Sequence, residues 1–132
     1  MSLRDAIAAA PNAGQPLPWL ATAGQPSLAD FQAAHAAGVR TVIDLRDPME
    51  PRPFDEAAEM AKLGITYVNI PVTPGAPDAT AHEKIQAALA AASGTPTILH
   101  CASANRVGGA LLPWLILHEG MSEEQATEVA MQ

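Results

Sequence analysis

The chain has 132 residues, of which 48% are hydrophobic and 16% are charged, and its formal net charge is −7. This length fits a single domain, which we expect to span residues 1–132. The acidic balance argues against nucleic acid as a partner, because no basic stripe exists to replace counterions. No segment resembles a membrane span or a signal peptide, so we expect a cytoplasmic protein with no membrane partner.

The first segment, residues 1–18, is interrupted by prolines and is expected to be irregular. Strand-like and helix-like pieces alternate in the rest of the chain. Ser27 and Asp30 resemble a capping box, which predicts a helix that ends at Gly38. The segment "VRTVIDL", residues 39–45, is β-branched and mostly apolar, as in a buried parallel strand.

The same alternation continues through the middle of the chain. Residues 54–64 are predicted to form a helix with a terminal glycine, and residues 65–72 a strand. The Pro/Gly-rich residues 73–78 should form a loop. A second long helix is expected over residues 79–93, followed by the strand "PTILH", residues 96–100.

The last part is predicted to be helical over residues 106–120, with a kink at Pro113. Ser122 with Gln125 suggests one more helix start, and no stop signal precedes Gln132, so we expect the natural chain to continue. Helices of this length between strands imply crossover connections. The fold class is therefore α/β, a mostly parallel sheet with helices on both faces, and ligands should bind at the carboxyl ends of its strands.

Cys101 is the single cysteine of the chain and follows the predicted strand that ends at His100. The residues after it are small enough to curl so that several backbone N–H groups meet at one point: Ala102, Ser103, Ala104 and Asn105. Such a curl at a helix N-terminus binds oxyanions, and Arg106 adds a planar fork that can hold two oxygens. The same field favours a thiolate at Cys101, which could attack the centre of a bound anion. The alternative is a small buried core residue.

Other polar residues have plainer interpretations. "DLRD", residues 44–47, is best explained by a salt bridge or a strand cap, and the acidic segment "FDEAAE", residues 54–59, by a solvated helix face. His100 is expected to be structural, its imidazole bound to backbone groups beneath the loop. The remaining histidines show no metal-ligand spacing, and neither a metal nor another cofactor is expected.

Three stretches of the chain stand out together: "TVIDLRD", "GITYVNIPV" followed by an aspartate loop, and "PTILHCASANRVGGAL". They resemble the cysteine-dependent protein tyrosine and dual-specificity phosphatase superfamily, and more closely its bacterial DUF442 branch, which is also found ahead of β-lactamase-like hydrolase domains. The resemblance covers roughly residues 19–120. It implies a three-layer phosphatase-like fold and a phosphomonoester hydrolase that acts through a phosphocysteine.

By this resemblance Cys101 is the nucleophile, Arg106 the phosphate clamp and Asp78 the general acid, while His100 supports the loop. The phosphate-binding residues would be those of the loop that follows the cysteine: Ala102, Ser103, Ala104, Asn105, Arg106 and Val107. Asp78 is as well explained by a helix N-cap, and one residue could serve both roles. The expected substrate is a phosphorylated protein or a small phosphomonoester.

Two departures keep alternatives open. Four residues separate Cys101 from Arg106, where most of the superfamily has five, and this spacing also occurs in rhodanese-type sulfurtransferases. Val107 stands where most members have a hydroxyl residue that helps the thiolate leave. The alternatives are a sulfurtransferase that carries a persulfide on Cys101 and a weakly catalytic module that binds phosphorylated ligands.

Overall fold

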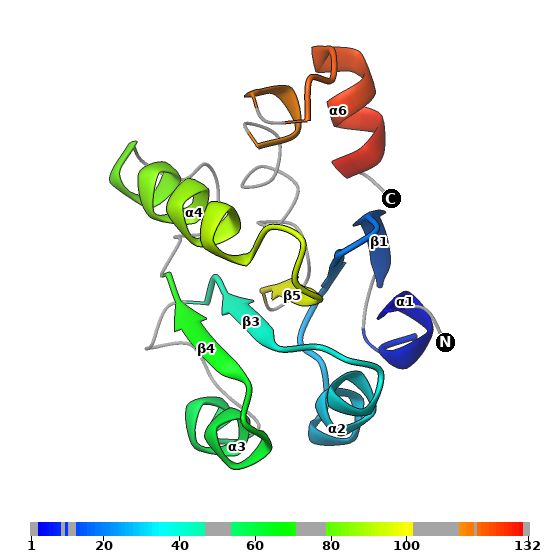
Figure 1. Ribbon diagram of the computed structural model, residues 1–132, viewed down its shortest axis with the longest axis vertical. Coiled ribbons are helices and arrows are strands. Elements are labelled where there is room, and N and C mark those ends of the chain that lie inside the picture. Colours follow the sequence, from blue (N-terminus) through cyan, green and yellow to red (C-terminus); the bar gives the residue numbers. More distant parts are fainter. Residues whose placement is uncertain are drawn as a thin grey trace.

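A computed structural model of the chain describes residues 3–8, 10, 13–46, 54–70, 79–101, 114–117 and 119–130. Its named helices and strands follow one another along the chain as in Figure 1. The helices are α1 (Leu3–Ala6), α2 (Leu28–Ala36), α3 (Glu56–Leu63), α4 (Ala79–Ala92) and α6 (Glu123–Ala130). The strands are β1 (Gly14–Leu17), β2 (Leu20–Ala23), β3 (Thr41–Asp44), β4 (Thr66–Asn69) and β5 (Thr97–His100).

The five strands form one sheet in the order β1-β2-β5-β3-β4. β1 pairs antiparallel with β2, and the other neighbours pair in parallel. β5 therefore lies in the middle, between β2 and β3. In register, His100 pairs with both Ala23 and Asp44, and Asp44 pairs with Asn69. These four residues form a row at the carboxyl ends of the parallel strands, so the described residue directly after each of them lies along one edge of the sheet.

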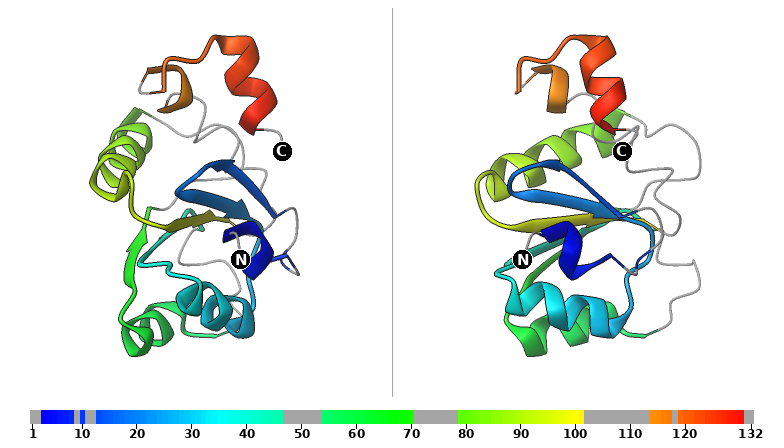
Figure 2. Two further views of the ribbon diagram at one scale, coloured as in Figure 1. Left: turned by 45° about the vertical axis from the view of Figure 1, so that its right-hand side comes forward. Right: turned by 90° about the vertical axis from the view of Figure 1, so that its right-hand side faces the viewer.

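Helices cover both faces of the sheet, which gives the three layers of an α/β fold. α2 and α3 lie on one side and α4 and α6 on the other (Figure 2). Successive strand residues face opposite layers: Ile98 packs in the core cluster with Phe31 and Met60, whereas Leu99 packs in the cluster with Ile85. Because apolar residues point to both faces, the parallel strands are nearly continuous hydrophobic runs, as the sequence predicts.

Local signals in the sequence fix the helix ends. Ser27 and Asp30 form the predicted capping box of α2, each side chain accepting a hydrogen bond from the other residue's backbone N–H. Ser122 and Gln125 do the same before α6, which confirms that predicted start. α3 ends at Gly64, whose φ of 75° lies in the left-handed region that glycine adopts without strain.

The predicted helices and strands are confirmed wherever they fall within the described residues, although β3 and β4 are shorter than expected. The expectation of an irregular segment over residues 1–18 is wrong in part, because α1 and β1 lie there. Residues 71–78 and 102–113 lie outside the described residues. The loop expected over residues 73–78 and the start of the helix expected over residues 106–120 therefore stay predictions. Within the part of the chain that the structure describes, no helix has the length and apolar character to cross a bilayer.

Candidate active site

Cys101 follows β5 at the carboxyl edge of the sheet, which is the position that the sequence predicts for it. Its backbone N–H donates to the carbonyl of Ala23 at 3.3 Å, and the carbonyl of His100 accepts from Leu45 N at 2.9 Å. The side chain is buried within the core cluster that also contains Leu99 and Trp114. The cysteine is thus fixed between two neighbouring strands, at the edge where α/β sheets bind ligands.

The other residues predicted for the catalytic loop are not all described. Asp78, Arg106 and Val107 lie outside the described residues, as do the small residues between Cys101 and Arg106. Of the predicted site residues, the structure describes His100 and Cys101. The roles of the rest stay predictions.

Four charged or ionisable side chains are buried beside Cys101, on the sheet face that carries α2 and α3. We call Asp44, Arg46, Glu56 and His100 the buried charge cluster; each is at most 1% exposed. Arg46 donates from Nε to Asp44 Oδ1 at 2.9 Å and from Nη2 to Asp44 Oδ2 at 2.8 Å. Nη2 also donates to Glu56 Oε1 at 3.0 Å. One guanidinium therefore bridges two carboxylates from β3 and α3.

Neighbouring residues complete the hydrogen bonds of this cluster. Tyr67 donates its hydroxyl to Asp44 Oδ2 at 2.5 Å, and Gln25 donates to Glu56 Oε1 at 3.1 Å. Asn69 donates to the backbone carbonyls of Asp44 and Arg46 at 2.8 and 2.9 Å. Side chains from β4 and from the segment between β2 and α2 thus hold the end of β3 and the first residue of α3. The segment "DLRD" is confirmed as a salt-bridge site.

The charges in the cluster shift each other's protonation. Burial raises the pKa of Asp44, but the hydrogen bonds from Arg46, the charge of His100 and the Tyr67 hydroxyl outweigh it, so the pKa lies below its ordinary value. Burial lowers the pKa of Arg46, but the Asp44 hydrogen bonds, with the charges of Asp44 and Glu56, raise it above its ordinary value. Asp44 and Arg46 therefore form a buried ion pair.

His100 connects the buried charge cluster to Cys101. Its Nε2 lies 2.6 Å from Glu56 Oε2 and 3.9 Å from Asp44 Oδ1. Its Nδ1 lies 3.4 Å from the carbonyl oxygen of Cys101, and its ring packs edge-on against Phe31 at a centroid distance of 5.7 Å. The structural role predicted for His100 fits this environment. The prediction that backbone groups satisfy the imidazole is wrong for Nε2, which faces a carboxylate.

Sequence reasoning missed Glu56. The segment "FDEAAE" was expected to be a solvated helix face, but Glu56 is 1% exposed. A signal was present: Glu56, Met60 and Leu63 are spaced i, i+4 and i+7 along α3, and this is the stripe that faces the core. A carboxylate on an apolar stripe needs buried cationic or N–H donors, which Arg46 and His100 provide.

The cluster also resembles a cation site in composition. One ligand atom each from Asp44, Glu56 and His100 lie within 4.8 Å of one another. Arg46, however, donates to both carboxylates and already supplies the positive charge that a metal would bring. We therefore interpret the group as an ion-pair network.

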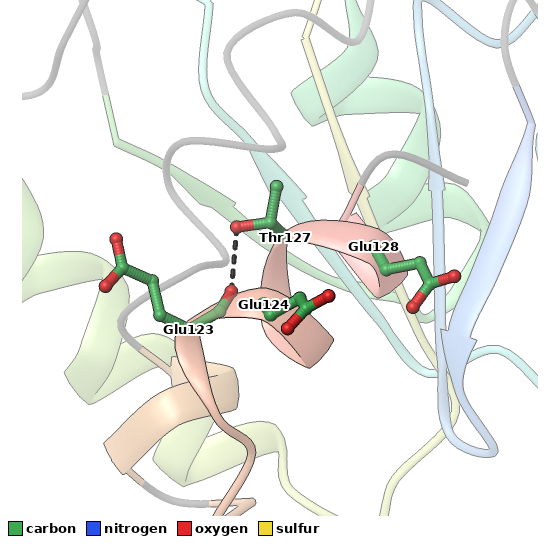
Figure 3. Close-up of a pocket in the computed structure, with 4 residues that line it drawn as sticks. All are labelled: Glu123, Glu124, Thr127 and Glu128. Carbon is green, nitrogen blue, oxygen red and sulfur yellow. Dashed lines mark hydrogen bonds between the residues drawn. The ribbon is translucent and has the colours of Figure 1, made fainter.

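A separate hollow of about 650 Å³ lies on the surface of α6. The described residues that line it are Glu123, Glu124, Thr127 and Glu128 (Figure 3). Thr127 donates its hydroxyl to the carbonyl of Glu123 at 2.8 Å, so it is engaged with its own helix. Three carboxylates repel a phosphate dianion, and the candidate active site is therefore the edge that carries Cys101.

Comparison with solved structures places the fold among the phosphatases. A DUF442 protein assigned as a phosphatase, from Shewanella putrefaciens CN-32, is 25% identical with a TM-score of 0.80, covering 94% of this chain and 83% of its own. Tk-PTP in its active form is 20% identical with a TM-score of 0.78, covering 91% and 82%. Kinase associated phosphatase, with its catalytic site cysteine replaced by serine, is 18% identical with a TM-score of 0.74, covering 98% and 78%.

The described residues form a mostly parallel sheet of five strands between helical layers, and this architecture is that of protein tyrosine and dual-specificity phosphatases. The model of one family, the phosphatase-like domain of beta-lactamase hydrolase-like proteins, matches residues 17–116. The chain belongs to this family. The resemblance drawn from the sequence is therefore confirmed. No curated protein matches the chain.

Proposed function

We propose that the protein hydrolyses phosphomonoesters with Cys101 as the nucleophile. The observation that carries the proposal is the position of Cys101 at the carboxyl end of the central strand β5, in a chain of a phosphatase-like family. The motif of His100, Cys101 and Arg106 supports it. In such a motif the guanidinium and the backbone N–H groups of the loop hold an oxyanion, and the thiolate attacks its central atom.

In the proposed reaction the Cys101 thiolate attacks phosphorus opposite the leaving oxygen. The sulfur–phosphorus bond forms, the phosphorus–oxygen bond of the ester breaks, and Asp78 gives its proton to the leaving oxygen. Asp78 then takes a proton from water, whose oxygen attacks phosphorus and releases inorganic phosphate and the thiolate. Arg106 and the amides of the loop after Cys101 stabilise the equatorial oxygens in both steps.

Val107 makes the second step the slower one in this proposal. Most related phosphatases carry a hydroxyl at this position that helps the thiolate leave, and valine has none. We therefore expect slow turnover and an accumulated phosphocysteine. Substrates would be a phosphorylated protein or a small phosphomonoester, among which aryl phosphates react fastest because their leaving groups need little protonation.

The test measures phosphate release from an aryl phosphate by wild-type protein and by Cys101→Ser. We expect the serine variant to lose activity by a factor of at least about 10³, because an alcohol is not ionised by this site. Glu124→Gln, in the hollow on α6, serves as a folded control that keeps wild-type activity. Activity of Cys101→Ser within a few-fold of wild type would refute the assignment of the nucleophile.

A second assay on the same preparations addresses sulfur transfer. Vanadate should inhibit phosphate release competitively, and thiosulfate with cyanide should give little thiocyanate. Thiocyanate formation that depends on Cys101, without phosphate release, would replace the proposal by a persulfide-carrying sulfurtransferase. A single burst of product followed by a stalled covalent protein would indicate a module that binds phosphorylated ligands.

A further inference from the structure

Glu56 has no place in the proposed reaction, yet it is buried and lies one side chain away from the cysteine. It is the first residue of α3, and each of its carboxylate oxygens faces nitrogen donors. Oε1 accepts from Arg46 at 3.0 Å and from Gln25 at 3.1 Å, and Oε2 lies 2.6 Å from His100 Nε2. Because Oε1 is fully engaged, Oε2 remains as the acceptor for the imidazole.

The second nitrogen of His100 faces another acceptor. Nδ1 lies 3.4 Å from the carbonyl oxygen of Cys101, and a carbonyl oxygen can only accept. Hydrogen bonds on both sides of the ring therefore require a proton on each nitrogen, which is the charged imidazolium. A neutral ring could make only one of the two contacts as a donor.

The charges around His100 agree with this form. Among the described residues, the carboxylates that face His100 are Asp44 from β3 and Glu56 from α3, and α2 contributes the ring of Phe31. Arg46 binds both carboxylates, and Tyr67 from β4 donates its hydroxyl to Asp44. Among the described side chains, two carboxylates and one guanidinium leave one net negative charge in a buried site, which is costly. An imidazolium at His100 brings the buried charge cluster to neutrality.

We infer that Glu56 is a positioning residue of the active site: its carboxylate holds His100 as an imidazolium whose Nδ1–H binds the Cys101 carbonyl and so fixes the backbone that carries the thiol. On one side of Cys101, its backbone N–H donates to the carbonyl of Ala23 in the neighbouring strand β2. His100 holds the carbonyl on the other side of Cys101. Both backbone groups of the cysteine are then tied, at the point where the chain leaves the sheet for the loop.

The role of Glu56 in catalysis rests on the proposed function, but the protonation state of His100 can be measured in a protein without phosphatase activity. Nitrogen-15 NMR of the four imidazoles in wild-type protein at pH 7 reports whether each ring nitrogen carries a proton. The His100 signals are assigned by elimination with Gln substitutions at His35, His82 and His118. We expect both nitrogens of His100 to be protonated, and a neutral ring in the wild-type protein would overturn the inference.

The variant Glu56→Gln tests whether the carboxylate of Glu56 keeps His100 in the charged form. Glutamine keeps the shape and can accept from Arg46, but it removes the charge that stabilises the imidazolium. We expect His100 to be neutral at pH 7 in this variant. On the alkaline limb of its pH profile on an aryl phosphate, kcat/KM should also fall by about tenfold relative to wild type.

Glu59→Gln is the matched control, because it makes the same change one turn further along α3. Glu59 pairs with Lys62 at the surface, where Lys62 is 71% exposed. This variant should keep the wild-type pH profile and the wild-type imidazole signals. A Glu56→Gln protein that is destabilised but has an unshifted profile would show a purely structural role and refute the inference. A doubly protonated His100 in a wild-type protein that releases no phosphate would refute the proposed function and leave the Glu56–His100 contact supported.

Discussion

Replacing Arg46 with methionine removes a cation that bridges two buried carboxylates. Arg46 makes hydrogen bonds to Asp44 Oδ1, Asp44 Oδ2 and Glu56 Oε1, all at 3.0 Å or less. Methionine fills much of the same volume but donates nothing. Among the described residues, His100 and neutral donors would then remain to compensate Asp44 and Glu56 in the core.

The expected loss can be estimated from these contacts. Removing one partner of a buried ion pair costs about 3–5 kcal/mol, because the remaining charge stays desolvated and unpaired. For 132 residues the entropy of unfolding near the melting temperature is about 0.28 kcal/mol/K. Arg46→Met should therefore lower Tm by about 11–18 °C at pH 7.

Thermal and urea unfolding followed by circular dichroism measure this loss. Arg40→Met is the matched control, since Arg40 is exposed and its guanidinium donates to the backbone carbonyls of His35 and Val39. Its free energy of unfolding should stay within about 0.5 kcal/mol of wild type. An Arg46→Met protein within about 1 kcal/mol of wild type would show that the desolvation of the ions offsets their attraction, and would refute the reasoning.

Two further predictions concern acid and catalysis. The pKa of Asp44 is lowered in the folded protein, so its stabilising effect is present above its ordinary value of 3.8 and is lost as the pH falls through the lowered pKa. The difference in unfolding free energy between wild type and Arg46→Met should therefore narrow below about pH 4 in urea titrations, and a constant difference would contradict this origin. Asp78→Asn should lower kcat by about 10²–10⁴ for alkyl phosphates and much less for activated aryl phosphates. Equal losses of kcat on both substrates, in steady-state assays, would show that Asp78 acts as a helix N-cap and not as the general acid.

The layers of the fold could be predicted because their signals are local. The capping pairs Ser27/Asp30 and Ser122/Gln125, together with Gly64, mark helix ends within four residues of sequence. The runs that became β3 and β5 are apolar on both faces, which only a covered parallel sheet explains. From these signals the position of Cys101 at the carboxyl edge follows by chain order alone.

α1 and β1 were not predicted, since each is only four residues long and their segment is rich in proline. β1 is an edge strand that pairs antiparallel with β2 through a two-residue turn at Pro18 and Trp19. Edge strands tolerate proline because one side of their backbone needs no partner. The stability of these elements comes from tertiary contacts: Ile7 is fully buried in the core cluster that includes Phe31.

The buried charge cluster was beyond sequence reasoning for a different reason. Glu56 and His100 are 44 residues apart, and their contact exists only because β3 pairs with β5 while α3 packs beside β4. Asp44 and Arg46, two residues apart, could be recognised as a pair, but nothing local shows that Glu56 shares the guanidinium. Long-range pairing decides which carboxylate of an acidic segment is buried.

The neutrality of this cluster matters for the chemistry at the edge of the sheet. The chain carries a formal net charge of −7, and two of its carboxylates, those of Asp44 and Glu56, are buried next to the strand that ends at His100. Unpaired charges so close to Cys101 would oppose both the thiolate and a phosphate dianion, since Coulomb repulsion is strong where water is excluded. Arg46 cancels one of these charges, and an imidazolium at His100 cancels the other. An acidic protein can thus carry the anion-binding edge that we propose, because it keeps the acids beneath that edge paired.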